Sequence, residues 1–441
     1  MHELGVTPRE ASALLWRLAW PIALTGQLAV LAEAINIYWL GRLLGDDALA
    51  VEATLRPIVN CIGWTLVSIA TGVSVLVAQS VGARDGRGLT YVTSGLRLVI
   101  AMSLVLAILV LPFGGPLARW LAPPGVRPED LLAFGLPAIL LMMPGIALVQ
   151  VLLNAASGAG WTRLATVRMA IDLCATALIV PLFVAVLGLG LLGAPLAQAC
   201  VQAALTAWVW RALYAQRVRL HLEGATPAQT RERPYREILA VGLPLQIARI
   251  ATFASHAYLV QRIADDGRAP VVGFGIALLL LFFAATLVAA IGRAVGIAFG
   301  QAIGANDRSR ARMIMRTGLV LGTLTGVMLA ATCYVLADPV VSVFTSDPAT
   351  QARGGDALRI LALALVPLGS AAVYMFVHAA VKASRSAAAV AITADALGLV
   401  YVWLASGDEM TAAAWSICVS NTIRVALFVM SSRTSVGRSL H

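Results

Sequence analysis

A small set of ionisable side chains lies inside long apolar stretches of the sequence. A charge at the centre of a bilayer costs about 2.5–3.5 kcal/mol on insertion scales, so such a group usually faces a partner or a water-filled cavity. Carboxylates can bind protons or help to bind sodium, and histidine can change its charge near physiological pH. The residues whose types fit this chemistry, or the binding of a charged substrate, are Glu33, Asp172, Arg249, His256 and Asp395.

Four of these residues form two pairs with the same spacing. Adding 223 to Glu33 gives His256, and adding 223 to Asp172 gives Asp395. Burial disfavours the charged form of a carboxyl. We therefore expect Glu33 or Asp172 to bind a proton or to help to bind sodium. Asp395 and His256 are further candidates, and the four residues would then approach one central site. The alternative is a structural ion pair, for example between Arg249 and one of the acids.

The other reactive side chains are predicted to be structural. The five cysteines lie in apolar runs without a CxxC spacing, which favours small core residues over a zinc site or disulfides. No HExxH or GxSxG motif occurs, so we predict no enzyme, no catalytic residues, no metal site and no cofactor besides the coupling ion. The remaining ionisable residues inside the spans are expected to lie near helix ends and to snorkel; they are Arg97, Arg293, His378 and Arg424.

Membrane-spanning helices must position these residues. Hydrophobic residues make up 60% of the 441 residues and charged residues 12%, whereas soluble proteins carry about 25% charged residues. A bilayer core about 30 Å thick takes a helix of about 20 apolar residues. The apolar runs predict an all-α integral membrane fold of about twelve helices, at residues 14–40, 52–77, 91–111, 131–153, 164–187, 191–213, 237–262, 271–298, 313–336, 356–380, 386–404 and 411–431.

The two halves of the chain resemble each other. LAWPIAL around Pro21 matches VGLPLQI around Pro244, and VAQSVGARD at 77–85 matches FGQAIGAND at 299–307. An even number of helices per half makes the two copies point the same way, and such parallel repeats are related by an axis along the membrane normal, with the substrate site between them. Prolines inside the predicted spans are expected to kink the helices; they are Pro21, Pro144, Pro181, Pro244 and Pro367.

The repeat predicts two pseudo-two-fold related lobes of six helices, at 1–213 and 237–441, joined by an Arg-rich cytoplasmic linker at 214–236. Lys and Arg are concentrated in alternate loops, which places both termini in the cytoplasm by the positive-inside rule. The basic residues form no single face, so we predict no nucleic-acid partner. We expect a monomeric multi-pass protein of the bacterial inner membrane, surrounded by lipid and acting on a small-molecule substrate.

Several motifs together resemble those of the MATE (multidrug and toxic compound extrusion) transporters. They are LAWPIAL, WLGRLLGDDALA at 39–50, the repeated VAQSVGARD segment, and NAASGAGWTRLATVRMAI at 154–171. The resemblance implies a two-lobed antiporter that exports small organic, often cationic and drug-like, compounds in exchange for H⁺ or Na⁺ by alternating access. The alternative is a flippase for a lipid-linked oligosaccharide or a related amphiphile, because the wider group that contains such flippases shares the repeated motif.

The sequence departs from this family at the usual coupling residues. The resemblance implies an acid in the first helix where this chain has Asn36, and an Asn…Asp pair in the fifth helix where it has Thr176 and Val180. A glutamate of some sodium-coupled members falls near Thr252. Glu33 lies one helical turn before Asn36, on the same face, so it is the expected replacement for the first-helix acid.

A second group of residues is predicted to line the substrate cavity. Aromatic rings could stack on flat or cationic compounds, although Trp and Tyr also occupy the membrane interface. Arg249 keeps its charge, so it would either neutralise a carboxylate or contact an anionic substrate. The substrate-cavity candidates are Asn36, Tyr38, Trp64, Arg249, Tyr258, Phe283 and Tyr374.

Overall fold

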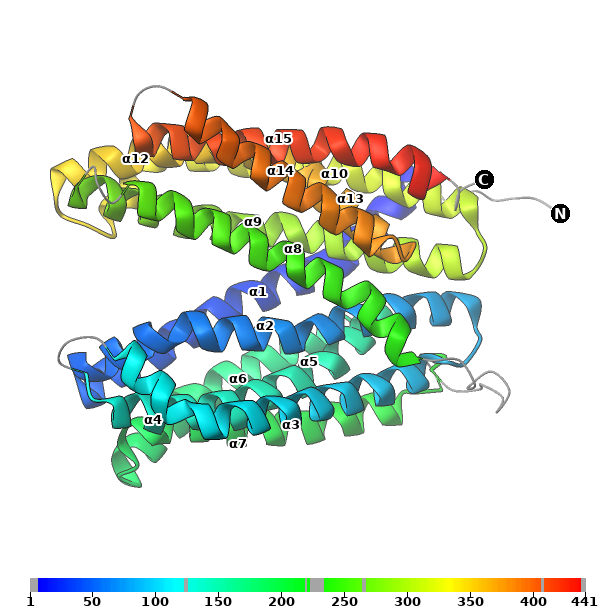
Figure 1. Cartoon of the computed structure of the whole chain (residues 1–441). Coiled ribbons are helices and arrows are strands. Elements are labelled where there is room, and N and C mark those ends of the chain that lie inside the picture. The colour runs from blue at the N-terminus through cyan, green and yellow to red at the C-terminus, as the bar shows by residue number, and fades with distance from the viewer. Residues whose placement is uncertain are drawn as a thin grey trace. The chain divides into compact units, whose positions relative to one another are not determined.

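The computed structural model describes residues 7–122, 126–218, 220–222, 234–263, 267–405 and 408–437. Within these ranges the backbone is helical almost throughout, and the described residues contain no β-strand. Figure 1 shows long helices joined by short connections. The predicted all-α fold is confirmed.

The described part of the first half contains long helical runs that correspond to the predicted spans. A π-helical segment joins α4 to α5, another follows α6, and a 3-10 turn precedes α7. The bounds are α1 Pro8–Leu44, α2 Asp46–Ala83, α3 Gly88–Leu121, α4 Pro128–Pro137, η1 Ala138–Met142, α5 Met143–Gly158, α6 Arg163–Pro181, η2 Leu182–Val186, η3 Gly190–Leu192 and α7 Gly193–Ala215.

The second half repeats this plan with helices of similar length. Its tenth predicted span is divided into two helices, α12 and α13, and a short helix, α11, precedes them. The bounds are α8 Pro234–Ile263, α9 Arg268–Gly304, α10 Arg308–Val335, α11 Ala337–Ser342, α12 Pro348–Leu363, α13 Leu365–Ala380, α14 Ser384–Leu404 and α15 Glu409–Ser435.

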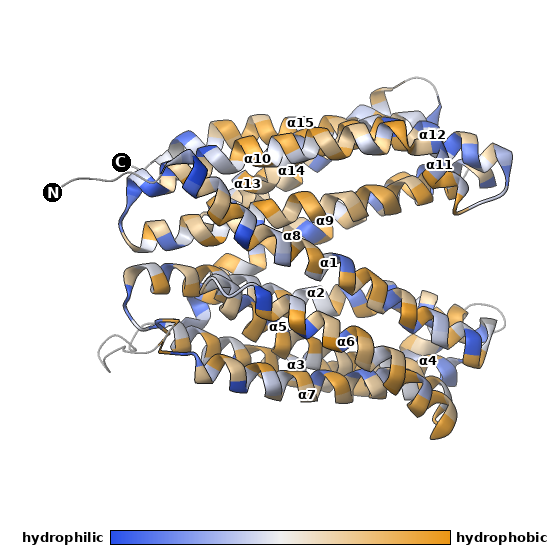
Figure 2. Ribbon diagram, turned by 180° about the vertical axis from the view of Figure 1, so that it is seen from behind, coloured by the Kyte–Doolittle hydropathy of each residue, from blue (hydrophilic) through white to orange (hydrophobic). Residues whose placement is uncertain are grey.

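The helices have the length and composition that a bilayer requires. Among the described residues, eleven helices are long and apolar enough to cross a membrane, or up to twelve if the bent pair α12 and α13 forms one span. Figure 2 shows hydrophobic residues along most of the length of the helices, and hydrophilic residues gathered mainly toward their ends. The prediction of about twelve membrane-spanning helices is therefore confirmed.

Three of the five prolines interrupt regular α-helix. A proline has no N–H and its ring clashes with the carbonyl four residues earlier. Pro144 lies two residues after the end of the π-helical segment η1, Pro181 directly precedes the π-helical segment η2, and Pro367 follows the junction at which α12 and α13 are bent by 44°. Pro21 and Pro244 lie inside α1 and α8, which continue as single helices.

The chain groups into two compact units, and each is described here by itself. The boundaries fall within α1 and α8, so each of these helices contributes to both units. The N-terminal unit is Leu24–Leu243, and the C-terminal unit is Met1–Ala23 together with Pro244–His441. The division predicted from chain order, 1–213 and 237–441, stays a prediction, and residues 223–233 of the predicted linker 214–236 lie outside the described residues.

The first turns of α1 pack into the hydrophobic core of the C-terminal unit, and the first turns of α8 pack into that of the N-terminal unit. Leu15 and Leu18 of α1 are buried with Val295 and Phe299 of α9 in the core of the C-terminal unit. Ile238 of α8 is fully buried in the core of the N-terminal unit. Burial of apolar surface contributes about 25 cal/mol per Å², so these contacts fix where each shared helix enters its unit.

Helices α10 and α13 approach each other closely at Gly322 and Gly369. A Cβ atom on Gly369 would overlap the backbone carbonyl of Gly322, which cannot move aside as a flexible side chain can. We expect Gly369→Ala to destabilise the protein by about 1–3 kcal/mol, the usual effect of overpacking. Thermal unfolding of the purified protein measures this effect.

Gly275 of α9 provides the matched control for this substitution. It lies in the same unit and in a helix, and a Cβ atom there would have no neighbour within 4 Å. Gly275→Ala should leave stability unchanged or raise it by up to about 1 kcal/mol, because alanine has the higher helix propensity. Equal melting temperatures for the two variants would show that the α10–α13 contact is not close-packed.

Candidate functional site

The N-terminal unit contains a polar pocket of about 240 Å³ between α1, α2, α6 and α7. Apolar residues such as Val59, Phe134 and Met143 form part of its wall. Its polar lining includes two of the predicted acids and Asn36, one of the two substrate-cavity candidates of the first helix. These polar residues are Glu33, Asn36, Glu52, Arg56, Asn60, Asp172, Gln198 and Gln202.

Glu33 and Glu52 share one arginine at this pocket. Arg56 Nη1 donates to Glu33 Oε1 at 2.7 Å, and Arg56 Nη2 donates to Glu52 Oε2 at 2.7 Å. Glu52 and Arg56 are four residues apart, so they lie on one face of α2. The Glu33 side chain is 55% exposed, so its carboxylate remains open to the pocket. Asn36, one turn further along α1, has a buried Oδ1 atom without a hydrogen-bond partner among the described residues.

Asp172 lies in a second polar group on α6 and α7. Arg168 Nη1 contacts Asp172 Oδ2 at 3.3 Å, and Gln202 Nε2 donates to Asp172 Oδ1 at 3.1 Å. Arg168 also donates to the side-chain oxygen of Gln202, which closes a ring of three residues. Gln198 extends the group by donating to Thr176 Oγ1 at 2.9 Å. Asp172 is 5% exposed and Arg168 is 3% exposed, so this is a buried ion pair with additional hydrogen bonds.

The two arginines that pair with these acids were not among the predicted site residues. Arg56 lies within the predicted span 52–77 and Arg168 within the predicted span 164–187, on α2 and α6. The missed signal was the spacing of four residues from Arg56 back to Glu52 and from Arg168 to Asp172, which puts each pair on one helical face.

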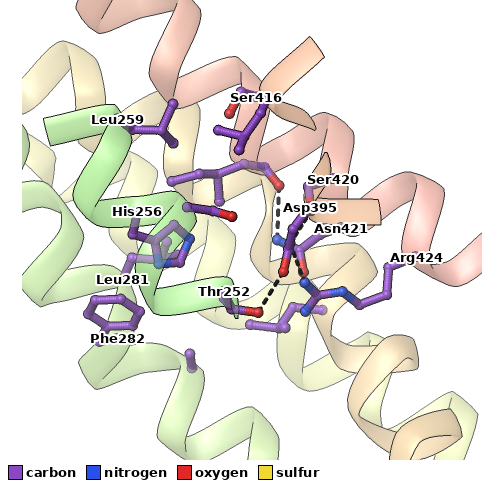
Figure 3. Close-up of a pocket in the computed structure, with 15 residues that line it drawn as sticks. Thr252, His256, Leu259, Leu281, Phe282, Asp395, Ser416, Ser420, Asn421 and Arg424 are labelled. Carbon is purple, nitrogen blue, oxygen red and sulfur yellow. Dashed lines mark hydrogen bonds and ion pairs between the residues drawn. The ribbon is translucent and has the colours of Figure 1, made fainter. Parts of the chain in front are cut away.

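The C-terminal unit has its own pocket of about 130 Å³ (Figure 3). Residues from α8, α9, α14 and α15 form most of its lining. The polar part of the lining holds the predicted residues Asp395 and His256 and several hydroxyl groups. Its polar residues are Thr252, Ser255, His256, Asp395, Ser416, Ser420, Asn421 and Arg424.

Asp395 is the centre of a hydrogen-bond network in this pocket. Its Oδ1 accepts from Ser420 at 2.7 Å and from Arg424 Nη2 at 2.5 Å, and its Oδ2 accepts from Thr252 at 2.6 Å. Asp395 is 7% exposed. The three donors come from α8 and α15, so the network ties both helices to α14 (Figure 3). Thr252 stands where the resemblance implied a glutamate, and here its hydroxyl supports a carboxylate from another helix.

Arg424 and His378 do not snorkel, which corrects the prediction. Arg424 is directed at Asp395 because α14 and α15 are antiparallel neighbours that bring the two residues into contact. His378 is fully buried, and its Nδ1 lies 2.8 Å from the carbonyl oxygen of Tyr374. Its Nε2 lies 3.3 Å from Ser431 Oγ, so the ring is held at both nitrogens.

The four ion-coupling candidates are distributed over two pockets. Glu33 and Asp172 line the pocket of the N-terminal unit, whereas His256 and Asp395 line that of the C-terminal unit. Each pocket is formed within its own unit, and the expectation that all four approach one site stays a prediction. Within the N-terminal unit, Glu33 pairs with Arg56 and Asp172 pairs with Arg168, whereas the ion pair with Arg249 of the other unit stays a prediction.

Most substrate-cavity candidates lie outside both pockets. Asn36 lines the N-terminal pocket, and Arg249 is exposed on α8. Tyr38 and Phe283 are exposed, and Tyr374 stacks on Phe428 with ring centroids 6.0 Å apart. The aromatic residue that lines the C-terminal pocket is Phe282, the neighbour of the predicted Phe283. Contact of these candidates with substrate stays a prediction, as it does for Trp64 and Tyr258, which are half-buried.

The fold and the pockets define a class of protein before any comparison. Long apolar helices with buried ion pairs inside them are typical of multi-pass membrane proteins whose polar groups face a pathway for ions or small molecules. The model of the MatE family matches the chain at residues 21–183 and again at 244–404. The chain therefore belongs to the MatE family of membrane transporters, and the two matches, one per half, confirm the internal repeat.

Named relatives and a solved structure agree with this assignment. The chain is 29% identical over 374 residues to the probable multidrug resistance protein NorM of Deinococcus radiodurans, covering 81% of this chain and 79% of that one. It is 20% identical over 366 residues to the probable multidrug resistance protein YoeA of Bacillus subtilis, covering 78% and 77%. The fold matches the Vibrio cholerae MATE transporter VcmN in its bent form, with a TM-score of 0.84 at 18% identity, covering 98% of each chain.

Proposed function

We propose that the protein is a secondary active antiporter that exports small organic compounds in exchange for H⁺ or Na⁺ by alternating access. The observation that carries the proposal is the excess of carboxylates at the N-terminal pocket. Glu33, Glu52 and Asp172 are balanced by only two guanidinium groups, those of Arg56 and Arg168. An unbalanced negative charge in a cleft with apolar walls attracts cations, which is the property that a coupling site needs.

The coupling ion binds at Glu33 and Glu52 in this proposal. Two carboxylates that share one guanidinium leave one negative charge unbalanced, and this charge attracts a cation. Na⁺ would find oxygen ligands in the same carboxylates and in the unpartnered Oδ1 of Asn36. Asp172 has its own arginine and serves as a second candidate, whose role is to bind the ion when Arg168 releases it. Asp395 and His256 of the C-terminal unit are further candidates for coupling.

Export of drug-like compounds is the substrate part of the proposal. Its support is the family assignment together with the relatives named as probable multidrug resistance proteins. The same relatives come from bacteria, so we place the protein in the bacterial inner membrane, acting as a monomer. The concentration of Lys and Arg in alternate loops supports cytoplasmic termini.

A flippase for a lipid-linked oligosaccharide is less well supported. Such a protein would use a cationic cavity to bind phosphate. Arg56 and Arg424 line the two pockets and Arg168 contacts the lining residue Asp172, so each of the three arginines is paired with a carboxylate. The N-terminal pocket therefore attracts cations and not phosphates, which favours the antiporter.

Export from cells tests the proposal directly. Expression in a bacterium that lacks its own drug exporters should raise the ethidium concentration that stops growth and should speed the loss of cellular ethidium fluorescence. Collapse of the pH gradient should stop this export if H⁺ is the coupling ion, and collapse of the Na⁺ gradient should stop it if Na⁺ is. Absence of ethidium export, combined with rescue of a strain defective in oligosaccharide translocation, would favour the flippase instead.

A further inference from the structure

The pocket of the C-terminal unit differs in charge from that of the N-terminal unit. Asp395 and Arg424 form an ion pair in its wall, and the other polar lining groups are hydroxyls, an amide and His256. We propose that this pocket binds an uncharged compound with one aromatic ring and an amide-like polar group. The binding of this compound does not depend on the proposed function. Only its identification as a transported substrate rests on that function.

The charges around the pocket disfavour charged organic compounds of either sign. A cation bound next to Asp395 would also lie next to Arg424, whose Nη2 is 2.5 Å from the carboxylate. An anion that approached Arg424 would meet Asp395 in the same way. The carboxylate also accepts hydrogen bonds from Thr252 and Ser420, so it has little remaining capacity to accept hydrogen bonds from a ligand. A neutral ligand meets no like charge at either residue, and it leaves the ion pair intact.

Unpartnered polar atoms at the pocket show which groups the ligand must carry. Among the described residues, His256 Nδ1, Asn421 Oδ1 and Arg424 Nε are buried and have no hydrogen-bond partner. The Asn421 amide nitrogen donates to the carbonyl of Ile417 at 2.9 Å, which fixes its oxygen as the free acceptor. Asn421 is 8% exposed. Buried polar groups in proteins are nearly always hydrogen-bonded, so these atoms call for a ligand that both donates and accepts.

A single amide group can pair with two of these three atoms. Its N–H can donate to Asn421 Oδ1, and its carbonyl oxygen can accept from the Nε–H of Arg424. An alcohol has only one hydrogen to donate and a less defined geometry, whereas the planar amide presents donor and acceptor side by side. The amide class therefore matches the two free atoms of α15 best.

The apolar part of the lining has room for one ring. Leu259, Leu281 and Ile417 are nearly fully buried and line the pocket with Phe282, whose ring lies 5.4 Å from that of His256. The volume of about 130 Å³ is close to that of an engineered apolar cavity of about 150 Å³ that binds benzene. This volume limits the ligand to a single ring and excludes a larger fused system.

Three compounds of nearly equal shape test the charge argument. Benzamide is neutral, benzamidine carries a positive charge and benzoate carries a negative charge. In calorimetric titrations of the full-length protein in lipid nanodiscs, benzamide should bind, and the two ions should bind at least about tenfold more weakly, because each meets a like charge in the pocket. Equal binding of all three, or no binding of benzamide, would overturn the proposal.

Variants of α15 and α9 locate the binding site. Asn421→Leu removes the free acceptor and should weaken benzamide binding by about 3- to 10-fold, the usual effect of one hydrogen bond. Ala285→Leu narrows the pocket without changing a polar group and should also weaken binding. Thr422→Val is the matched control, because Thr422 is exposed, does not line the pocket, and bonds only to the carbonyl of Cys418.

Unchanged binding in both Asn421→Leu and Ala285→Leu would contradict the assignment to this pocket. The titration measures binding without transport, so its outcome is independent of ethidium export. If benzamide binds as described and cells export no ethidium, the proposed function fails and the binding site stands. If cells export ethidium and benzamide does not bind, the inference fails and the proposed function stands.

Discussion

Replacing Glu33 with glutamine should slow gradient-driven export at least about tenfold, which corresponds to about 1.4 kcal/mol. Glu33 and Glu52 contact the two ends of the same guanidinium, that of Arg56, at 2.7 Å each. Only one of these carboxylates can be neutralised by Arg56, so the other is available for a proton or Na⁺. Glutamine keeps the shape and the hydrogen-bonding length of Glu33 but removes this excess charge, so the coupling cation loses its site.

A series of variants separates coupling from folding. Glu33→Gln and Glu52→Gln should each weaken ethidium transport driven by a pH or Na⁺ gradient in proteoliposomes, and the double variant should abolish it. Glu129→Gln is the matched control, because Glu129 is an exposed acid of the same unit, on α4, that does not line the pocket. The assignment would be refuted by wild-type rates in the double variant.

Asp172→Asn extends the series to the second acid of the N-terminal pocket. This change leaves the buried Arg168 without its ion-pair partner, so Arg168→Gln is combined with it to avoid an uncompensated charge. If the variant that combines Asp172→Asn with Arg168→Gln loses transport at a normal melting temperature, coupling would be assigned to Asp172 as well. If Glu33→Gln and Asp172→Asn both transported at the wild-type rate, coupling by the N-terminal pocket would be excluded.

The elements of the fold could be predicted from the sequence because each depends on local composition. An apolar run long enough to span the bilayer marks a helix, and all the predicted spans coincide with helices. Proline has a local steric effect, and Pro144, Pro181 and Pro367 lie near the irregular segments. The repeat could be recognised because equivalent positions of the two halves keep a constant separation along the chain. This separation also relates positions whose side chains differ, such as Glu33 and His256.

The partners of the buried acids could not be predicted in the same way. An ion pair between Asp395 and Arg424 depends on the register of two antiparallel helices, which no local pattern specifies. Arg56 lies within the predicted span 52–77, but the contact of its guanidinium with Glu33 depends on how α1 and α2 pack against each other, which the sequence pattern does not specify.

The ion pair of the C-terminal unit should dominate the stability of that unit. Arg424→Met removes the charge but keeps most of the side-chain volume, and it leaves the Asp395 carboxylate buried with only the hydroxyls of Thr252 and Ser420. Breaking a buried pair in this way costs about 3–5 kcal/mol. We expect the melting temperature of the purified protein to fall by at least about 5 °C, whereas Arg433→Met, at the exposed end of the same helix, should not change it.

Removal of the Asp395 charge as well should restore most of the stability lost in Arg424→Met. In the double variant Asp395→Asn with Arg424→Met no uncompensated charge remains, and replacement of a whole buried ion pair by neutral groups is often neutral for stability. A double variant as unstable as Arg424→Met alone would show that the hydrogen bonds of Asp395, and not the charge pair, hold α8, α14 and α15 together. A single Arg424→Met variant as stable as Arg433→Met would mean that Asp395 does not depend on Arg424, so the pocket would lack the fixed pair that disfavours charged organic compounds.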